Sequence, residues 1–254
     1  SQQEEATNRE PEPTAVVAST SLPEPATGTW PEYSAREFLR AHGIPVVPGI
    51  LATSEQEAVS AARTLGFPVA LKVQAREIAH KSDIGGVLLH VASDDEVQRG
   101  FQTIMHNAGA RVASAAIDGI LVSPMRPAGL EMLVGIIRDP LWGQVLAVGL
   151  GGIWAEVLKD TSVRVLPIRR DDIEQMLSEL HGAPLLQGTR GQPSVNSELL
   201  VDTIFRIAQV AQGVQDRLEV LEINPLLLHG SNVEALDVLM AWTDAKANSR
   251  HTPD

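Results

Sequence analysis

Cysteine is absent from this chain of 254 residues. Without thiols the protein can form neither disulfides nor thiolate metal sites, and a cysteine nucleophile is excluded. Aromatic residues make up only 4% of the sequence, so platforms on which nucleic-acid bases stack are few. Basic residues number 20 against 32 acidic ones, and the formal net charge is −12. This acidic balance argues against nucleic acid as a partner, because binding a phosphate backbone requires positive charge.

Long hydrophobic runs are also missing. No apolar stretch reaches the roughly 20 residues that a membrane-spanning helix requires, and the N-terminus lacks the basic-then-apolar pattern of a secretory signal. The first residue is Ser1 rather than Met, which is consistent with trimming. We therefore expect a cytoplasmic protein without membrane contact, whose 44% of hydrophobic residues suffice for a sizeable core.

The composition divides the chain into a body and two tails. Residues 1–29 are rich in Glu, Pro, Ala, Ser and Thr and hold few large apolar groups, so we predict a disordered arm. Residues 244–254 are interpreted as a C-terminal tail. About 225 residues remain for folded structure, enough for one domain or two small ones. A change of pattern near Gly129 predicts two subdomains, residues 30–128 and residues 129–243.

Hydrophobic periodicity, capping-box patterns and glycine stops predict the helices. They are expected at Glu32–His42, Ser54–Leu65, Ser93–Ala108, Asp171–Leu180 and Ser197–Gln212. Short apolar runs bounded by turn residues predict the strands. They are expected around Lys72 and at Val87–Val91, Gly119–Met125, Glu131–Ile137, Gln144–Val148, Leu218–Leu228 and Val233–Val238. Helices and strands mix without strict βαβ alternation, so the predicted fold class is α+β.

The stretch from Val69 to Val87 carries the strongest chemical signal. Lys72 lies inside a short apolar strand, where a charge is costly unless it is paired. A loop with the sequence His-Lys-Ser-Asp at residues 80–83 follows, and Gly85–Gly86 opens the next apolar run. A lysine aimed between two strands joined by such a loop forms a candidate phosphate cradle, which favours nucleotide chemistry. The alternative is an edge-strand lysine whose ammonium group reaches into solvent.

His80 in that loop is interpreted as a general base or as a nucleophile that accepts a phosphoryl group. Lys81 beside it would then hold the transferred charge. The alternative is a solvated loop histidine, which is the usual state of a lone histidine. The other histidines show no paired spacing and are interpreted as structural or surface residues.

A magnesium site is the second candidate. Glu222 and Asn224 stand two residues apart in an apolar strand, so both side chains point to one face. Carboxylate and amide oxygens are hard ligands that suit Mg²⁺. Asp237 on the next expected strand supplies a third ligand if the two strands pair as a hairpin. The alternative for Asn224 and Pro225 is a simple turn.

Two weaker patterns complete the candidates. Gly149–Gly152, followed by Glu156, permits close approach of a ligand to the backbone, and the alternative is a tight turn. The strand end at Val122–Met125 would expose backbone groups to an adenine edge, with Glu131 near enough to reach ribose hydroxyls.

Five segments carry a resemblance when they are taken in order. They are EYSAREFLRAHGIPV, FPVALKVQAREIAHKSDIGGV, GLEMLVGIIRDPLWGQVLAVGLGGIWAEVLKD, Gly188-Thr189-Arg190-Gly191, and LEINPLLL with Asp237 behind it. Together they resemble the ATP-grasp domain of NDP-forming acyl-CoA synthetases, the succinyl-CoA synthetase β-chain superfamily. The likeness is closest to the ADP-forming acetate–CoA ligase type and covers about Pro31 to Trp242. Five ordered motifs are far more specific than any single one.

The resemblance implies an ATP-grasp fold whose two subdomains enclose a nucleotide. Lys72 is expected to bind ATP phosphates together with Lys81 and Ser82. His80 matches a loop histidine proposed, in the acetate–CoA ligase branch, to carry phosphate transiently.

Hinge and metal residues are implied in the same way. The nucleotide is expected to contact Ser123, Pro124, Met125 and Glu131 near the hinge, and Mg²⁺ is expected at Glu222, Asn224 and Asp237. Many acetate-ligase relatives have Asp where Glu222 stands, and either carboxylate serves a hard metal.

The implied reaction converts an acid, CoA and ATP into acyl-CoA, ADP and phosphate, with ATP/ADP and Mg²⁺ as cofactors. This chain would move the phosphoryl group between nucleotide and histidine. The matched length leaves no room for a CoA-binding domain or for the domain with the main phosphohistidine. We therefore expect a β subunit whose partner is an α subunit that supplies the CoA and acid sites. Two alternatives stay open: another ATP-grasp carboxylate ligase, and a non-catalytic regulatory nucleotide-binding module.

Overall fold

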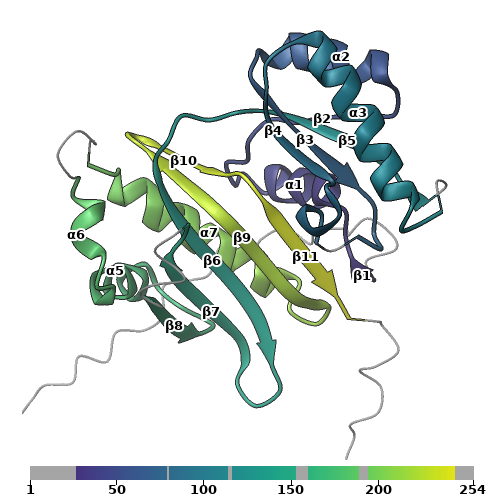
Figure 1. Cartoon of the computed structure of the whole chain (residues 1–254). Helices are drawn as coiled ribbons and strands as arrows, with labels where there is room; N and C mark the ends of the chain where they lie inside the picture. The colour runs from purple at the N-terminus through teal and green to yellow at the C-terminus, as the bar shows by residue number, and fades with distance from the viewer. Residues whose placement is uncertain (1–26, 79, 114–115, 153–159, 189–193, 244–254) are drawn as a thin grey trace, which may run out of the picture.

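Two antiparallel sheets with helices packed against them build this protein (Figure 1). The computed structural model describes residues 27–78, 80–113, 116–152, 160–188 and 194–243. The mixture of helices and sheets confirms the α+β class. Among the described residues, no helix is both long enough and apolar enough to span a membrane.

The helices begin and end close to their expected positions. They are α1 (Glu32–Ala41), α2 (Glu55–Leu65), α3 (Asp94–Gly109), α5 (Arg170–Glu179), α6 (Ala183–Leu186) and α7 (Ser197–Gly213), with a 3₁₀ turn at Ser82–Ile84. The strands are β1 (Gly28–Thr29), β2 (Ile50–Ala52), β3 (Val69–Gln74), β4 (Val87–Val91), β5 (Gly119–Pro124), β6 (Leu130–Asp139), β7 (Gly143–Leu150), β8 (Thr161–Val165), β9 (Leu218–His229), β10 (Asn232–Ala235) and β11 (Val238–Trp242).

The small sheet has the strand order β2-β5-β3-β4 and is covered by α2 and α3. Val69, Leu71 and Val73 turn one face of β3 into this core, so the residues between them face the other way. The capping boxes at the starts of α2 and α3 are confirmed. The Ser54 and Ser93 hydroxyls accept from backbone N–H groups three residues on, and the glutamates there accept from the residue before the cap.

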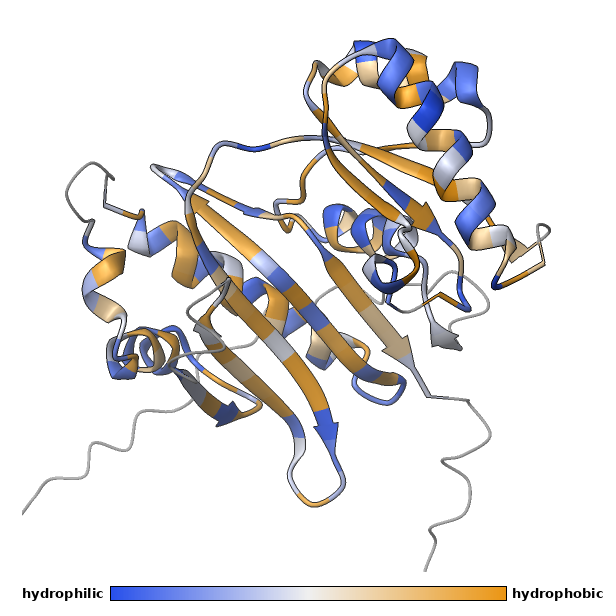
Figure 2. Ribbon diagram, viewed as in Figure 1, coloured by the Kyte–Doolittle hydropathy of each residue, from blue (hydrophilic) through white to orange (hydrophobic). Residues whose placement is uncertain are grey.

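The large sheet has the order β1-β11-β9-β6-β7-β8, with β10 also paired to β9. Its core is built with α1, α5 and α7, and Figure 2 shows that strands of both sheets are mainly hydrophobic. The expected subdomain boundary at 128/129 falls in the connection from β5 to β6, which joins the two sheets. Residues 30–46, expected in the first subdomain, nevertheless contribute Trp30, Phe38 and Val46 to the core of the large sheet. An amphipathic stripe shows that a helix packs on a sheet, but does not show on which sheet.

Part of the predicted N-terminal arm is ordered, which corrects that prediction. Gly28 and Thr29 form β1, opposite Trp242 and Ala241 of β11. The polar composition of the arm gave no sign of this pairing, because backbone hydrogen bonds need no particular side chain. Residues 1–26 lie outside the described residues.

The single strand predicted at Val233–Val238 is also wrong. β10 and β11 follow one another along one edge of β9, and Leu236 and Asp237 interrupt them. The Leu236 backbone N–H donates to the carbonyl of Pro225 at 3.0 Å, so the chain stays attached to β9 through the break. Strand β8 was not predicted, since its Val163 and Val165 stay 55% and 44% exposed and give no strong burial pattern.

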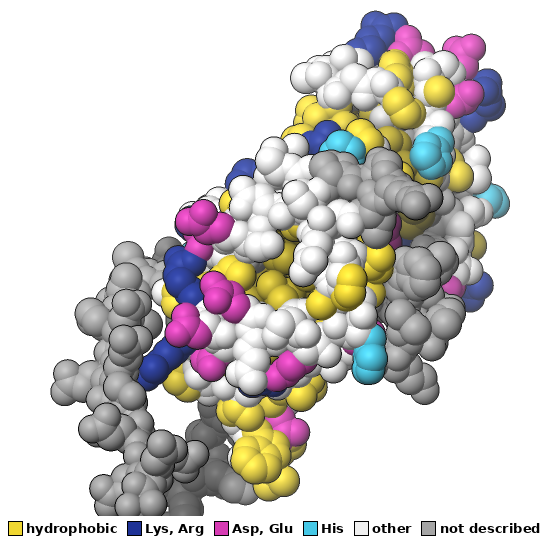
Figure 3. Space-filling model, turned by 90° about the vertical axis from the view of Figure 1, so that its left-hand side faces the viewer, with side chains coloured by type: hydrophobic (Ala, Val, Ile, Leu, Met, Phe, Trp, Pro, Cys, Tyr) yellow, Lys and Arg dark blue, Asp and Glu magenta, His cyan; other side chains and the backbone are white. Residues whose placement is uncertain are grey.

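The β6–β7 hairpin ends in exposed apolar side chains. Leu141 is 88% exposed and Trp142 is 67% exposed, and Figure 3 shows hydrophobic side chains at this lower tip of the molecule. The Asp139 carboxylate accepts from the backbone N–H groups of both residues, at 2.8 and 2.9 Å. The turn of the hairpin is therefore held by Asp139.

Candidate functional site

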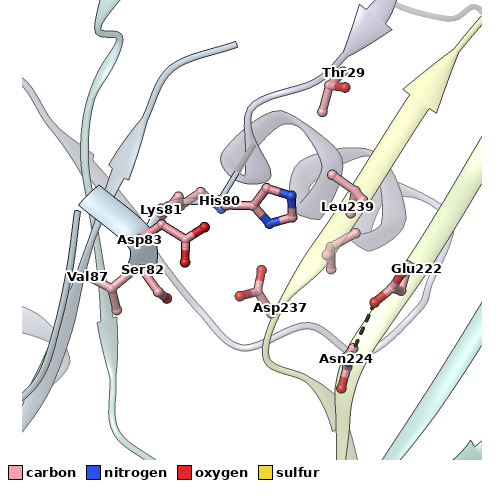
Figure 4. Close-up of a pocket in the computed structure, with 11 residues that line it drawn as sticks. Thr29, His80, Lys81, Ser82, Asp83, Val87, Glu222, Asn224, Asp237 and Leu239 are labelled. Atoms are coloured by element: carbon pink, nitrogen blue, oxygen red, sulfur yellow. Dashed lines mark hydrogen bonds between the residues drawn. The ribbon is translucent and has the colours of Figure 1, made fainter. Parts of the chain in front are cut away.

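A cleft of about 400 Å³ lies between the loop after β3 and the strands β9 and β11 (Figure 4). The small-sheet side contributes the predicted phosphate loop, namely His80, Lys81, Ser82 and Asp83, together with Val87. The large-sheet side contributes the predicted metal ligands, namely Glu222, Asn224 and Asp237, with Thr29, Val238 and Leu239 beside them. The fold thus brings together the two strongest sequence candidates, which lie far apart along the chain.

Strand register builds the large-sheet wall. Glu222 pairs with Leu239 of β11, and the backbone N–H of Asn224 donates to the carbonyl of Asp237 at 3.2 Å. The Asn224 amide nitrogen donates to Glu222 Oε1 at 3.3 Å, so both side chains share one face as predicted. The alternative of a simple turn at Pro225 is wrong, because β9 continues through it to His229.

Lys72 does not line the cleft, but lies behind its small-sheet wall. Strand β3 pairs with β4 on one side and β5 on the other, so the edge-strand alternative for Lys72 is wrong. Its side chain is only 12% exposed, and the ammonium group lies 2.9 Å from Asp237 Oδ2. A lysine of one sheet therefore forms an ion pair with a carboxylate of the other, across the cleft.

The 3₁₀ turn positions the phosphate loop. The backbone N–H of Gly86 donates to the carbonyl of Lys81 at 2.8 Å, and Gly85 adopts a φ of 66°, which favours glycine. At Gly86 a Cβ atom would lie 2.7 Å from Val73 Cγ1, so a side chain there would collide with the core of the small sheet. The glycine pair thus lets the loop fold tightly against β3 and hold Lys81 beside Lys72.

Glu32 of α1 is a buried carboxylate that joins both lysines. Its side chain is 0% exposed, and its Oε1 lies 3.0 Å from Lys72 Nζ, while its Oε2 lies 2.9 Å from Lys81 Nζ. The Arg36 guanidinium donates to the same carboxylate and to Ser123 Oγ, the latter at 2.9 Å. Burial raises the pKa of Glu32, but Lys72, Arg36 and Lys81 together outweigh burial and lower it to about 2.

Asp237 shows the opposite balance. Burial and the neighbouring Glu32 charge raise its pKa above the ordinary value, although Lys72 and Lys81 oppose them. Two carboxylates therefore compete for Lys72, and Glu32 is the more strongly ionised. Three cationic side chains against two carboxylates leave this network with an excess of one positive charge.

The oxygen donors at the cleft fit a hard cation in part. Among the described residues, no three His, Cys, Asp or Glu side chains are grouped closely enough to hold a metal ion by themselves. Glu222, Asn224 and Asp237 instead offer two carboxylates and one amide oxygen at one cleft. This donor set suits Mg²⁺, which usually takes one or two carboxylates and completes its shell with phosphate and water.

The predicted hinge residues lie elsewhere. Ser123, Pro124, Met125 and Glu131 are not part of the cleft lining. Ser123 is buried and accepts from Arg36, and the Met125 backbone N–H donates to the carbonyl of Pro68 at 2.9 Å. Glu131 lies beside the glycine cluster, since Gly151 donates to its carbonyl at 2.7 Å. Glu156 and residues 189–191 of the motifs lie outside the described residues.

Sequence reasoning missed Glu32, Arg36 and Thr29. Glu32 and Arg36 stand four residues apart at the start of α1, a spacing that signals an ion pair on one helix face. The pattern carried no sign that Lys72 and Lys81 complete the network. Thr29 was assigned to the arm, but lines the cleft.

Comparisons with known proteins show the family of the chain. Residues 24–241 match the family model described as ATP-grasp domain. The chain is 39% identical over 209 residues to the beta subunit of acetate–CoA ligase [ADP-forming] I of Pyrococcus furiosus, covering 82% of this chain and 90% of that protein. It is 40% identical over 216 residues to trans-feruloyl-CoA synthase FCS1 of an unknown prokaryotic organism, and there spans 84% of this chain but only 30% of the relative.

Solved structures give the same result. The dinucleotide-forming acetyl-coenzyme A synthetase 1 of Ca. Korarchaeum cryptofilum, in complex with coenzyme A and Ca-AMPCP, matches with a TM-score of 0.78 and 35% identity. The match covers 85% of this chain and 93% of that chain. A second structure of that protein, with Mg-AMPPCP and a phosphohistidine segment pointing towards the nucleotide binding site, matches with a TM-score of 0.70 and 33% identity, covering 83% and 91%.

Proposed function

The chain belongs to the ATP-grasp domain family, and we propose that it is the nucleotide-binding β subunit of an ADP-forming acyl-CoA synthetase. The cleft between the sheets carries this proposal. It places Lys81 opposite an oxygen-rich wall with Glu222, Asn224 and Asp237, and Lys72 lies behind the lining, paired with Asp237. Such a pair of walls suits a nucleotide polyphosphate that arrives with a divalent cation.

The two lysines would bind the phosphate groups. Their side chains are 12% and 17% exposed, so the lysines would act in a partly desolvated site where electrostatic attraction is strong. Phosphate oxygens would compete with Asp237 for Lys72, and Asp237 would then be free to serve as a ligand of Mg²⁺. Mg²⁺ held by Glu222, Asn224 and Asp237 would supply charge neutralisation on the phosphates.

His80 would pass the phosphoryl group. Its imidazole projects into the cleft between the loop and β11 (Figure 4). In the relay, the lone pair of a neutral ring nitrogen forms a bond to the γ-phosphorus, and the bond to ADP breaks with its electrons on the departing oxygen. A histidine of the partner then takes the phosphoryl group in the same way. Lys81 beside His80 would balance the transferred charge.

The nucleoside would lie farther along the connection between the sheets. We assign the adenine edge to the backbone of Ser123, Pro124 and Met125, and the ribose to Glu131. The glycines leave room for Glu131, since a Cβ atom at Gly152 would lie 2.8 Å from its Oε2, and Gly151 donates to its carbonyl.

An α subunit would supply the CoA and acid sites. The chain spans 90% of the Pyrococcus beta subunit but 30% of the feruloyl-CoA synthase. The CoA and acid sites would therefore belong to the part of such enzymes that this chain does not match. The isolated chain should therefore bind Mg-ATP and make no acyl-CoA. Isothermal titration with Mg-ATP and a thioester assay test both statements.

The phosphoryl relay has its own test. The complex with its α subunit is incubated with γ-labelled ATP, quenched in alkali, and the label is mapped on this chain. Label on His80, lost together with turnover in His80→Asn, supports the relay. Substantial turnover by His80→Asn leaves His80 as a binding residue only. Nucleotide binding without turnover in the complex favours a regulatory module, and amide formation without CoA favours another ATP-grasp ligase.

A further inference from the structure

Glu32 is not part of the cleft lining, yet Lys81 of the lining and two cationic side chains behind it, Lys72 and Arg36, converge on it. Lys72 comes from the middle of β3, Lys81 from the loop, and Arg36 from α1 itself. Glu32 also belongs to a helix whose apolar side chains pack into the core of the other sheet. A single carboxylate thus ties the large-sheet body to the two lysines of the small-sheet wall.

We propose that Glu32 is a positioning residue that holds Lys72 and Lys81 side by side for the phosphate groups of the nucleotide. The proposal rests on the proposed function, because it needs these lysines to bind phosphate. Each lysine uses a different oxygen of Glu32, at 3.0 Å and 2.9 Å, so the planar carboxylate fixes the distance between the two ammonium groups.

Flexibility explains why such a residue is useful. A lysine side chain has four rotatable carbon–carbon segments and loses much rotamer freedom when it binds a ligand. A lysine already held by a buried carboxylate has lost that freedom before the nucleotide arrives, so binding costs less. Lys72 has Asp237 as a second partner, whereas Glu32 is the acid with which Lys81 is observed to pair in the described structure.

If net charge alone controlled phosphate affinity, removing the Glu32 charge would strengthen binding instead of weakening it. Removing its negative charge raises the excess of positive charge in the network, which attracts phosphate more strongly at long range. Positioning acts at contact distance, inside a site where solvent screens little. The sign of the change in phosphate affinity therefore separates the two effects.

The experiment compares Glu32→Gln, Glu32→Asp and Glu37→Gln in the full chain. Glu37 lies on the same helix, is 45% exposed at its side chain, and pairs only with Arg40 among the described ion pairs, so it serves as the matched control. Isothermal titration measures the affinity for Mg-ATP and for adenosine, which has no phosphate. Circular dichroism and a melting curve show that each variant is folded at the temperature used.

Glu32→Gln should weaken Mg-ATP binding about tenfold or more and leave adenosine within about twofold of wild type, because only the phosphate contacts lose their preorganisation. Glu32→Asp keeps the charge, but a shorter side chain cannot reach both lysines equally, so an intermediate loss is expected. Glu37→Gln should match wild type. In a Lys72→Met background, Glu32→Gln should weaken Mg-ATP binding less than it does alone, since residues that act through one another are not additive.

Three results would overturn the proposal. Unchanged or tighter Mg-ATP binding by Glu32→Gln would show that net charge, not placement, controls affinity. Equal losses for Mg-ATP and adenosine would show a general structural role. Full additivity with Lys72→Met would show that Glu32 does not act through that lysine. Should Glu32→Gln fail to fold, Glu32→Asp carries the same comparison. Wild-type protein that binds no Mg-ATP would instead reject the proposed function itself.

Discussion

The two walls of the cleft are built by different physics. On the large-sheet wall, neighbouring residues of β9 and β11 are placed by backbone pairing, and Glu222 lies opposite Leu239 by register. On the small-sheet wall, Lys72 and Lys81 are placed by a buried carboxylate that reaches them from a helix. A ladder fixes positions whatever the side chains are, whereas an ion network depends on each charge in it.

This difference sets how the walls respond to change. A polar substitution at the sheet wall leaves the backbone ladder in place and removes one ligand. A substitution in the ion network leaves the remaining buried charges without their partner, which is strongly destabilising. The predictions that follow compare the two walls, beginning with the largest expected effect.

Lys72→Met should reduce turnover of the complex with the proposed α subunit by about 10² to 10³-fold, because a donor proposed to bind the transferring phosphate is lost. Methionine keeps the apolar stem of lysine and most of its packing. Steady-state assays of the complex measure the loss. Turnover near wild type would mean that Lys72 serves only to pair Glu32 and Asp237 across the cleft.

The ion network should also make stability depend on pH. The pKa of Glu32 is lowered to about 2 in the folded protein from its ordinary value of 4.5, so its contribution to stability is present above pH 4.5 and is lost as pH falls towards 2. At about 1.4 kcal/mol per pKa unit, this is on the order of 3 kcal/mol. The difference in free energy of unfolding between wild type and Glu32→Gln, measured with urea, should be smaller at pH 3 than at pH 6. A constant difference would contradict the role of the Glu32 charge.

The sequence predicted the sheet wall better than the ion network, for a local reason. Glu222 and Asn224 share a face because strand side chains alternate, and that rule needs only two neighbouring positions. The position of Asp237 was harder to predict, because a continuous apolar pattern concealed the break between β10 and β11.

The ion network around Glu32 could not be predicted from the sequence by such a local rule. The sequence showed that Lys72 needs a partner, but any of 32 acidic residues would satisfy that need. Its partners Glu32 and Asp237 stand 40 and 165 positions away. Only the packing of α1 on the other sheet brings Glu32 to the lysines, and an amphipathic pattern does not determine that choice.

Glu222→Gln should act on the sheet wall without affecting the network. It removes one negative charge from the expected Mg²⁺ ligands and keeps an oxygen at the same place, so the apparent affinity for Mg²⁺ should fall by at least about tenfold. Titration of Mg²⁺ at saturating ATP measures this change, and the melting temperature should stay near that of wild type. A lowered melting temperature with unchanged Mg²⁺ dependence would place Glu222 in folding instead of metal binding.

The smallest expected effect concerns the end of the sheet wall, where β1 pairs with β11. A chain that starts at Thr27 keeps this pair and should match the full chain in melting temperature and Mg-ATP affinity, because residues 1–26 hold few large apolar groups. A chain that starts at Trp30 loses the pairing of Gly28 and Thr29 and should be less stable by about 1 kcal/mol, the net contribution of a backbone hydrogen bond or two. It also loses Thr29 from the cleft lining, so a modest drop in Mg-ATP affinity should accompany the loss of stability.

Trp30 itself must stay in both chains, because its ring centroid lies 4.7 Å from that of Trp242 and its backbone N–H donates to the carbonyl of Met240 at 2.9 Å. Equal behaviour of the two chains would show that β11 holds its place on β9 without β1, and that backbone pairing at the edge adds nothing to this wall.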